Sequence, residues 1–239
     1  MKLLTTNNAK TIKGEKKNYK TYILYMSPAY QNDKNINLCS HATKGCIESC
    51  LFKSGFGGIY TNVQKARIAK SNYFLNNRTN FLLQLKKEIQ NAIKNQKEGE
   101  KLAFRLNGTT DINFEKFKIQ DNKNIFELFP EVQFYDYTKN YVRLEKRILP
   151  PNYHITFSRS ETNEEKAIEM LNLGYNVAAV FDKLPTSYKG FKVINGDEND
   201  LRFLDEPGTI IGLKYKKLTG KGADNSKGIK SNFVIQTTL

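Results

Sequence analysis

Short apolar segments alternate with amphipathic stretches along most of the chain. The apolar segments have the length of buried β-strands, and the stretches between them repeat apolar residues every three or four positions, as helices do. This alternation is typical of repeated βα units with a largely parallel sheet. The strands predicted in this way cover residues 22–26, 102–106, 132–137, 154–157, 177–181, 191–194 and 210–215.

Helices are predicted between most of these strands. The longest helical region covers residues 63–93, and the polar residues 76–79 are expected to divide it, with Thr79 capping the second helix. Pro130, Pro150 and Gly174 fall where one unit should give way to the next. The other predicted helices cover residues 113–129, 141–148, 163–173 and 199–204.

The predicted fold class is α/β, with one domain over residues 21–239. About seven mostly parallel strands suffice for a complete or partial (βα) barrel, and an open doubly wound sheet is the alternative. Both architectures place function in the loops that follow the carboxyl ends of the strands. Residues 1–20 are polar and lysine-rich and are predicted to form a basic arm, either mobile or paired as an edge strand.

The charge of the chain predicts a polyanionic partner. Lys and Arg number 38 against 24 Asp and Glu, which gives a formal net charge of +14 among 239 residues. Such a surplus favours a nucleic acid or a nucleotide, although a lysine-rich coding bias explains it equally well. The sequence contains neither an apolar run of about 18 residues nor an apolar signal segment, so we expect no membrane association and a cytoplasmic location.

All three cysteines, Cys39, Cys46 and Cys50, lie in one predicted loop, residues 29–58, directly after the first predicted strand. In a reducing compartment, an odd number of closely spaced cysteines indicates metal ligands rather than disulfides. Three thiolates can hold an iron–sulfur cluster and leave one iron open. A zinc site would need a fourth ligand, for which His41 is the nearby candidate. Three unligated thiols are the remaining interpretation.

Charged residues also follow three other predicted strands. Asp111, Lys139 and Arg159 come after residues 102–106, 132–137 and 154–157. Because the carboxyl ends of parallel strands meet at one edge, these three are candidate catalytic residues: Lys139 and Arg159 to hold anionic groups, and Asp111 as acid or base. A structural alternative for Asp111 is the N-cap of a following helix. His154 is interpreted as a packed histidine.

Two segments near the C-terminus carry further charges. The alternation of Asp200, Arg202 and Asp205 predicts a clamp in which two carboxylates hold the arginine. Residues 214–222 form a basic strand and loop suited to phosphate contact, although they lack the spacing of a P-loop.

Four segments resemble a family of phage and mobile-element proteins called gene product 88, over residues 26–181. They are the C-x6-C-x3-C loop, Arg105-x-x-Gly108-x-x-Asp111, Phe134-Tyr-x-Tyr137-Thr138-Lys139, and residues 167–181. The cysteine triplet in turn resembles that of radical S-adenosylmethionine enzymes, whose partial (βα) barrel binds a [4Fe-4S] cluster after the first strand. Its spacing differs from the usual C-x3-C-x2-C.

These resemblances imply a phage or mobile-element metalloprotein. The predicted function is an iron–sulfur enzyme that acts on a nucleotide or nucleic acid, with a [4Fe-4S] cluster and S-adenosylmethionine as the implied cofactors. One alternative is a non-enzymatic nucleic-acid-binding protein stabilised by zinc. Another is a transglycosylase-like enzyme that modifies bases and uses a barrel aspartate as nucleophile.

Overall fold

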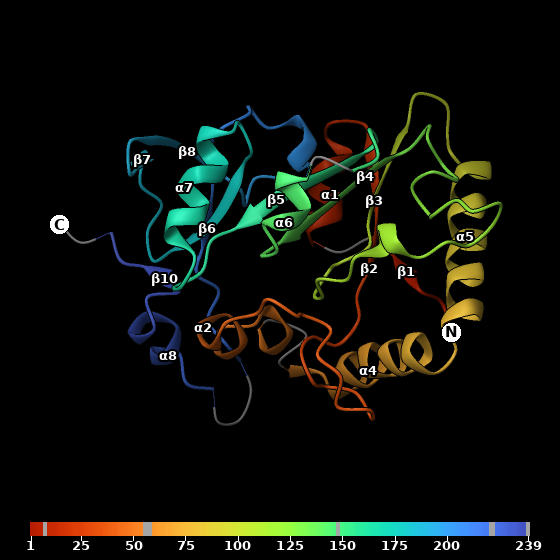
Figure 1. The fold of residues 1–239 in the computed structure, drawn as a ribbon, viewed down its shortest axis with the longest axis horizontal. Helices are drawn as coiled ribbons and strands as arrows, with labels where there is room; N and C mark the ends of the chain where they lie inside the picture. The colour runs from red at the N-terminus through yellow and green to blue at the C-terminus, as the bar shows by residue number, and fades with distance from the viewer. Residues whose placement is uncertain (7–8, 55–58, 147–148, 220–222, 238–239) are drawn as a thin grey trace.

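A sheet of ten strands forms the centre of the protein (Figure 1), in a computed structural model that describes residues 1–6, 9–54, 59–146, 149–219 and 223–237. All seven predicted strands are present, with ends displaced by at most three residues. The strands are β1 Leu4–Thr5, β2 Tyr19–Leu24, β3 Lys101–Arg105, β4 Gln133–Thr138, β5 Tyr153–Ser158, β6 Val177–Phe181, β7 Ser187–Tyr188, β8 Phe191–Asn195, β9 Ile210–Lys214 and β10 Val234–Ile235.

The strand order is β1-β2-β3-β4-β5-β6-β9-β8-β7, and β10 pairs with β6. Every pairing from β2 through to β8 is parallel, whereas β1 and β7 pair antiparallel with their neighbours. The prediction of a mixed α/β fold with a mostly parallel sheet is therefore confirmed. Among the described strands, the pairing runs from β1 to β7 without returning to its start.

β5 pairs only with the first residues of β6, through its own last two residues. β5 pairs with Val177 and Ala178 at the start of β6, whereas β10 pairs in parallel with Val180 and Phe181 at its end. β9 occupies the other edge of β6 along its whole length. The C-terminal strand β10 therefore lies beside the carboxyl-terminal end of β6, close to the loop that follows β5.

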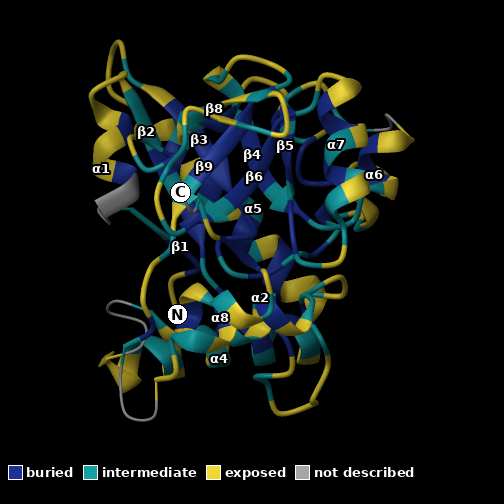
Figure 2. Ribbon diagram, turned by 90° about the vertical axis from the view of Figure 1, so that its left-hand side faces the viewer, coloured by how far each residue is buried: buried dark blue, intermediate teal, exposed yellow. Residues whose placement is uncertain are grey.

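Side chains alternate between two different faces of the sheet. Leu102 and Phe104 of β3 belong to the main hydrophobic core, whereas Ala103 packs with Tyr135 and Leu201 in a small second cluster. Figure 2 shows the strands as the most buried part of the molecule, with α2, α4 and α8 grouped beside them and exposed on their outer surfaces. The second face is more polar, because β3 places Arg105 on the same side as Ala103.

The longest helices of the described residues are α4, Thr61–Asn76, and α5, Arg78–Lys94. They meet at Asn77, which confirms the prediction that the polar residues 76–79 divide this helical region. The cap of α5 is Asn77, whose side chain accepts a hydrogen bond from the Asn80 amide, so the assignment of Thr79 as the cap is wrong. The shorter helices are α1 Ala9–Glu15, α2 Lys44–Glu48, α6 Val142–Glu145, α7 Glu164–Asn172 and α8 Ser226–Lys230.

The helix predicted over residues 113–129 is wrong. Only a 3-10 turn, η2 Phe114–Lys116, forms there, and Asp121 and Asn122 have positive φ angles of 50° and 56°. A run of residues in the left-handed region cannot continue a right-handed helix. Residues 199–204 likewise contain only the 3-10 turn η3 Arg202–Leu204, and α6 is shorter than predicted, with residues 147–148 outside the described residues.

The N-terminal residues belong to the sheet. Of the two forms expected for the basic arm, the edge strand is the one found, since β1 pairs antiparallel with β2. The Glu88 carboxylate accepts hydrogen bonds from the amides of Leu3 and Leu4, at 2.9 and 2.8 Å. β2 begins at Tyr19, so the predicted boundary between residues 20 and 21 falls inside a strand.

In the parts of the chain that the structure describes, we find no helix with the length and apolar character needed to cross a bilayer.

Leu4→Ala should lower the free energy of unfolding by about 2–5 kcal/mol, because Leu4 is only 1% exposed within the main core. The exposed neighbour Lys2 supplies the control, and Lys2→Ala should change the free energy by no more than about 0.5 kcal/mol. Urea unfolding followed by circular dichroism measures both. Equal, small effects would show that residues 1–5 do not contribute to the core.

Candidate functional site

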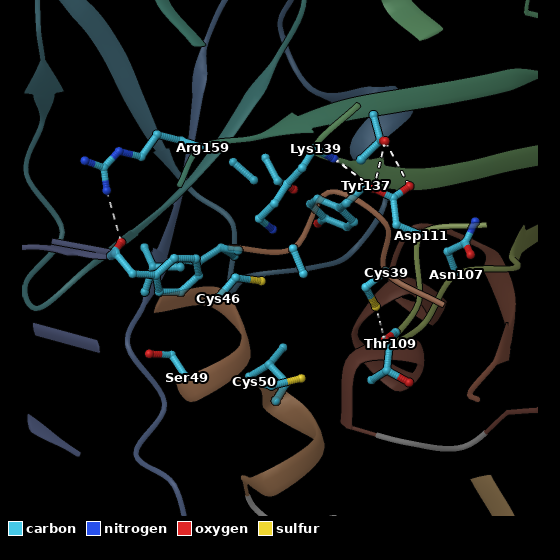
Figure 3. Close-up of a pocket in the computed structure, with 18 of the residues that line it drawn as sticks. Cys39, Cys46, Ser49, Cys50, Asn107, Thr109, Asp111, Tyr137, Lys139 and Arg159 are labelled. Atoms are coloured by element: carbon cyan, nitrogen blue, oxygen red, sulfur yellow. Dashed lines mark hydrogen bonds between the residues drawn. The ribbon is translucent and has the colours of Figure 1, made fainter. Parts of the chain in front are cut away.

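A cavity of about 220 Å³ lies at the carboxyl edge of the parallel strands (Figure 3). Its walls come from the loops after β3, β4, β5 and β9 and from the cysteine-containing segment between β2 and α4. The six residues that the sequence singled out for cofactor binding and catalysis, apart from His41, all line it: Cys39, Cys46, Cys50, Asp111, Lys139 and Arg159.

The cysteine-containing segment is folded onto the site. Cys46 lies in α2, whose N-cap Thr43 accepts a hydrogen bond from the Cys46 amide, and Cys50 directly precedes the turn η1, Leu51–Lys53. Cys39 Sγ lies 3.6 Å from the carbonyl oxygen of Thr109 in the loop after β3. In Figure 3 the sulfur atoms of Cys46 and Cys50 point to the same side, toward Cys39. All three thiols are half-buried and free.

Glu161, after β5, fixes the helix that carries Cys46. Its carboxylate accepts hydrogen bonds from the Gly45 amide and the Thr43 hydroxyl, both at 2.7 Å. One acid therefore holds the start of α2 against the sheet edge. The sequence carries no local signal for this role, because Glu161 and Gly45 are 116 residues apart.

Close packing against the C-terminal segment holds the same helix from the other side. A Cβ atom at Gly45 would lie 2.5 Å from Ser231 Oγ and 2.8 Å from Phe233 Cβ. At Gly228 of α8, it would lie 2.1 Å from Ser49 Oγ. Gly45 therefore allows the C-terminal segment to approach α2 closely, and Gly228 leaves room for the Ser49 hydroxyl where α2 and α8 meet.

Burial suppresses ionisation of two of the thiols. Desolvation raises the pKa of Cys39 to about 12 and also raises the pKa of Cys50. For Lys139, burial alone would lower the pKa, but the adjacent Cys46 outweighs it and the pKa is raised. The ammonium of Lys139 therefore provides positive charge beside the sulfur atoms.

His41 is not brought to the cavity. Its side chain is exposed, its Nδ1 lies 2.9 Å from Ser40 Oγ, and it is absent from the residues that line the cavity. Among the described residues, no three His, Cys, Asp or Glu side chains are close enough together to hold one metal ion. Within the part of the chain that the structure describes, Cys39, Cys46 and Cys50 therefore do not form a ready-made site for one metal ion, with or without His41.

Asp111 joins the ends of β3 and β4. Its carboxylate accepts hydrogen bonds from the Thr138 hydroxyl at 2.9 Å and from the Lys139 amide at 3.0 Å, and it lies 3.3 Å from Arg143 Nη1. These contacts cross between strands, and no helix begins at Asp111, so its assignment as a helix N-cap is wrong. Arg143 is itself paired with Glu115 at 2.8 Å.

Asn107 and Asp136 hold this junction from within the protein. The fully buried Asp136 carboxylate accepts hydrogen bonds from the Asn107 amide at 2.7 Å and from the Tyr153 hydroxyl at 2.9 Å. The Asn107 side chain in turn binds both backbone groups of Ile112, at 2.8 and 3.0 Å. The loop that presents Asp111 is therefore closed by an asparagine, a role that sequence reasoning missed.

Arg159 contacts the C-terminal segment. Its Nε lies 2.5 Å from Glu164 Oε2, and its Nη1 donates to the carbonyl oxygens of Asn232 and Phe233, at 2.5 and 3.1 Å. These bonds tie the end of β5 to the start of β10. Arg159 thus has a structural role in addition to lining the cavity.

Arg105 forms the inner wall of the cavity. Its Nη1 pairs with Asp200 at 2.9 Å, and its guanidinium carbon lies 4.5 Å from the centre of the Tyr137 ring. The prediction that Asp200 and Asp205 both hold Arg202 is therefore only partly right. Asp205 pairs with Arg202 at 3.1 Å, whereas Asp200 pairs with Arg105. Opposite charges within three residues made the local pairing plausible, but the tertiary partner competes for Asp200.

A comparison with known protein families shows to which family the chain belongs. The profile of the family described as Gene product 88 matches residues 1–236. The chain belongs to the Gene product 88 family. The match extends on both sides of the resemblance seen in the sequence over residues 26–181, and it includes the segment around β10. No curated protein and no solved structure matches this Gene product 88 chain.

Asp136 should give the Gene product 88 chain a pH-dependent stability. Burial raises its pKa from 3.8 to about 6, so the folded state binds the proton more tightly than the unfolded state. The resulting stabilisation is present below about pH 4 and is lost as the pH rises through about 6. Relative to Asp136→Asn, the free energy of unfolding of the wild type should fall by about 2–3 kcal/mol between pH 4 and pH 7. Urea unfolding at several pH values measures the difference, and a constant difference would contradict the assignment.

Proposed function

We propose that the cavity is the active site of an iron–sulfur enzyme that acts on a nucleotide or nucleic acid. The observation that carries the proposal is that all three cysteines of the chain line one cavity together with Asp111, Lys139 and Arg159. Three thiolates leave one iron of a [4Fe-4S] cluster without a protein ligand, and an open iron can bind a cosubstrate. S-adenosylmethionine is the cosubstrate that the radical-enzyme resemblance suggests.

The number of thiolates in the cavity is the reason for proposing a cluster rather than a single zinc ion. A structural zinc site normally takes four protein ligands, whereas a [4Fe-4S] cluster with one open iron needs only three thiolates. Cys39, Cys46 and Cys50 all line the cavity and supply that number. The exposed position of His41 also argues against its use as a fourth zinc ligand.

Positive charge beside the cysteines would help them to bind metal as thiolates. Cys39 and Cys50 have raised pKa values because they are buried, so metal binding must displace their protons. Lys139, whose pKa is raised next to Cys46, offsets part of the negative charge of the resulting thiolates. Cys39, Cys46 and Cys50 would hold the cluster in this arrangement.

The remaining residues suggest a division of roles. Lys139 and Arg159 are the cavity cations proposed to hold anionic groups of the substrate. Asp111 receives hydrogen bonds from Thr138 and Lys139 as a pure acceptor, which suits a base better than an acid. Its contacts with Arg143 and Thr138 would keep this carboxylate in a fixed orientation.

The order of the strands supports a partial (βα) barrel as the architecture of this enzyme. β2, β3, β4, β5 and β6 follow one another both along the chain and across the sheet, whereas a doubly wound sheet reverses direction at a switch point. In barrels the catalytic groups come from the carboxyl ends of several strands, which is where the cavity lies.

Reduced thiols and a cluster agree with a cytoplasmic location.

Anaerobic reconstitution with iron and sulfide tests the proposal. The wild type should develop the broad absorption near about 400 nm of thiolate-bound clusters, and Cys46→Ser should lose most of it. His41→Ala removes the only other soft ligand of the segment and should retain the full absorption. A colourless protein that binds zinc and loses it on His41→Ala would contradict the proposal and support the zinc-stabilised alternative.

A further inference from the structure

We propose that the substrate is a single-stranded nucleic acid, of which one nucleotide enters the cavity while the flanking phosphates lie on a basic rim. We define the basic rim as residues 51–54 together with residues 214–219. This inference deepens the proposed function and rests on it for the chemistry, but not for the binding.

The basic rim is one continuous structure although its two segments are far apart in the sequence. Ser54 and Leu218 form an antiparallel bridge, and the Thr219 amide donates to the Lys53 carbonyl oxygen at 3.0 Å. Leu51 from one segment and Lys214 from the other both line the cavity. A molecule that leaves the cavity on this side must therefore pass over the rim.

The charge of the basic rim is unbalanced. Lys53, Lys214, Lys216 and Lys217 are all exposed, and the rim segments themselves contain no Asp or Glu. Lys216 pairs with Asp197 at 3.1 Å, whereas the ammonium groups of Lys214 and Lys217 form no ion pair with any described residue. Uncompensated lysines beside a cavity are suited to phosphates, since each contact releases counterions.

The size of the cavity limits what can enter. A volume of about 220 Å³ is smaller than the roughly 300–1,000 Å³ of typical small-molecule pockets, so the cavity excludes a longer segment and admits at most one nucleotide unit. Leu51, which is 46% exposed, provides an apolar surface at the entrance on which a base can pack.

A polymer accounts for the charges that lie outside the cavity. Lys53 and Lys217 are part of the rim but do not line the cavity, so a free nucleotide seated inside would not use them. A duplex would have to extrude its base, at a cost of a few kcal/mol, whereas a single strand already presents unpaired bases. The rim and cavity together therefore favour a single strand.

The inference is tested by fluorescence anisotropy. A labelled single-stranded oligonucleotide of mixed sequence is titrated with the full chain. The triple variant Lys214→Gln, Lys216→Gln, Lys217→Gln should raise Kd at least tenfold. The dependence of log K on log salt should become shallower by about 2, since each single-strand phosphate contact contributes about 0.7. The same oligonucleotide as a duplex should bind at least tenfold more weakly.

A second triple variant controls for total charge. Lys87→Gln, Lys94→Gln, Lys97→Gln removes the same charge from exposed positions in and just after α5, which lies across the molecule from α8 in Figure 1. Its Kd should stay within twofold of the wild type. Equal weakening by both triples, equal affinity for duplex, or displacement of the oligonucleotide by equimolar nucleoside monophosphate would each overturn the inference.

The assay separates this inference from the cluster. Binding requires neither metal nor turnover, so wild-type protein purified without iron should bind the oligonucleotide with an affinity within about threefold of the reconstituted protein. If binding does not depend on the basic rim, the inference is wrong but the iron–sulfur proposal is unaffected. If no cluster can be reconstituted, the iron–sulfur proposal is wrong but binding of the oligonucleotide to the basic rim is unaffected.

Discussion

The buried carboxylate of Asp136 holds the wall of the cavity in place. It accepts the Asn107 amide at 2.7 Å, and Asn107 then closes the loop that presents Asp111. Asp111 in turn receives the Lys139 amide, and its own amide donates to the carbonyl oxygen of Leu38, the residue before Cys39. A chain of hydrogen bonds thus extends from the core of β4 to the first cysteine. Because Asp136 lies in low dielectric, loss of one partner would leave a costly unpaired charge.

The other two cysteines depend on a different set of contacts. Glu161 holds the start of α2, and Gly45 allows the C-terminal segment to approach the same helix closely. Arg159 binds that C-terminal segment through two carbonyl oxygens. The cysteine-containing segment is therefore positioned by β5 and by residues near the end of the chain. This explains how a segment with little regular structure can present its thiols to one cavity.

Much of the fold was predictable because parallel strands are buried on both faces and appear as short apolar runs, such as residues 177–181. The convergence of Asp111, Lys139 and Arg159 followed from the same reasoning, since parallel strands end at one edge. The aromatic residues between 113 and 129 were misleading, because Phe126 and Phe129 are buried in an irregular segment and yet lie three positions apart, as on one face of a helix. Partners distant in sequence, such as Arg105 for Asp200, leave no local signal.

The most direct measurement is the Mössbauer spectrum of anaerobically reconstituted protein enriched in the Mössbauer isotope of iron. The central claim is that three cysteines of one segment hold a cluster and leave one iron open. The account predicts a [4Fe-4S] spectrum in which one iron site differs from the other three, and in which that site alone shifts when a small anionic ligand is added. Four equivalent sites that do not respond, or no bound iron, would contradict it.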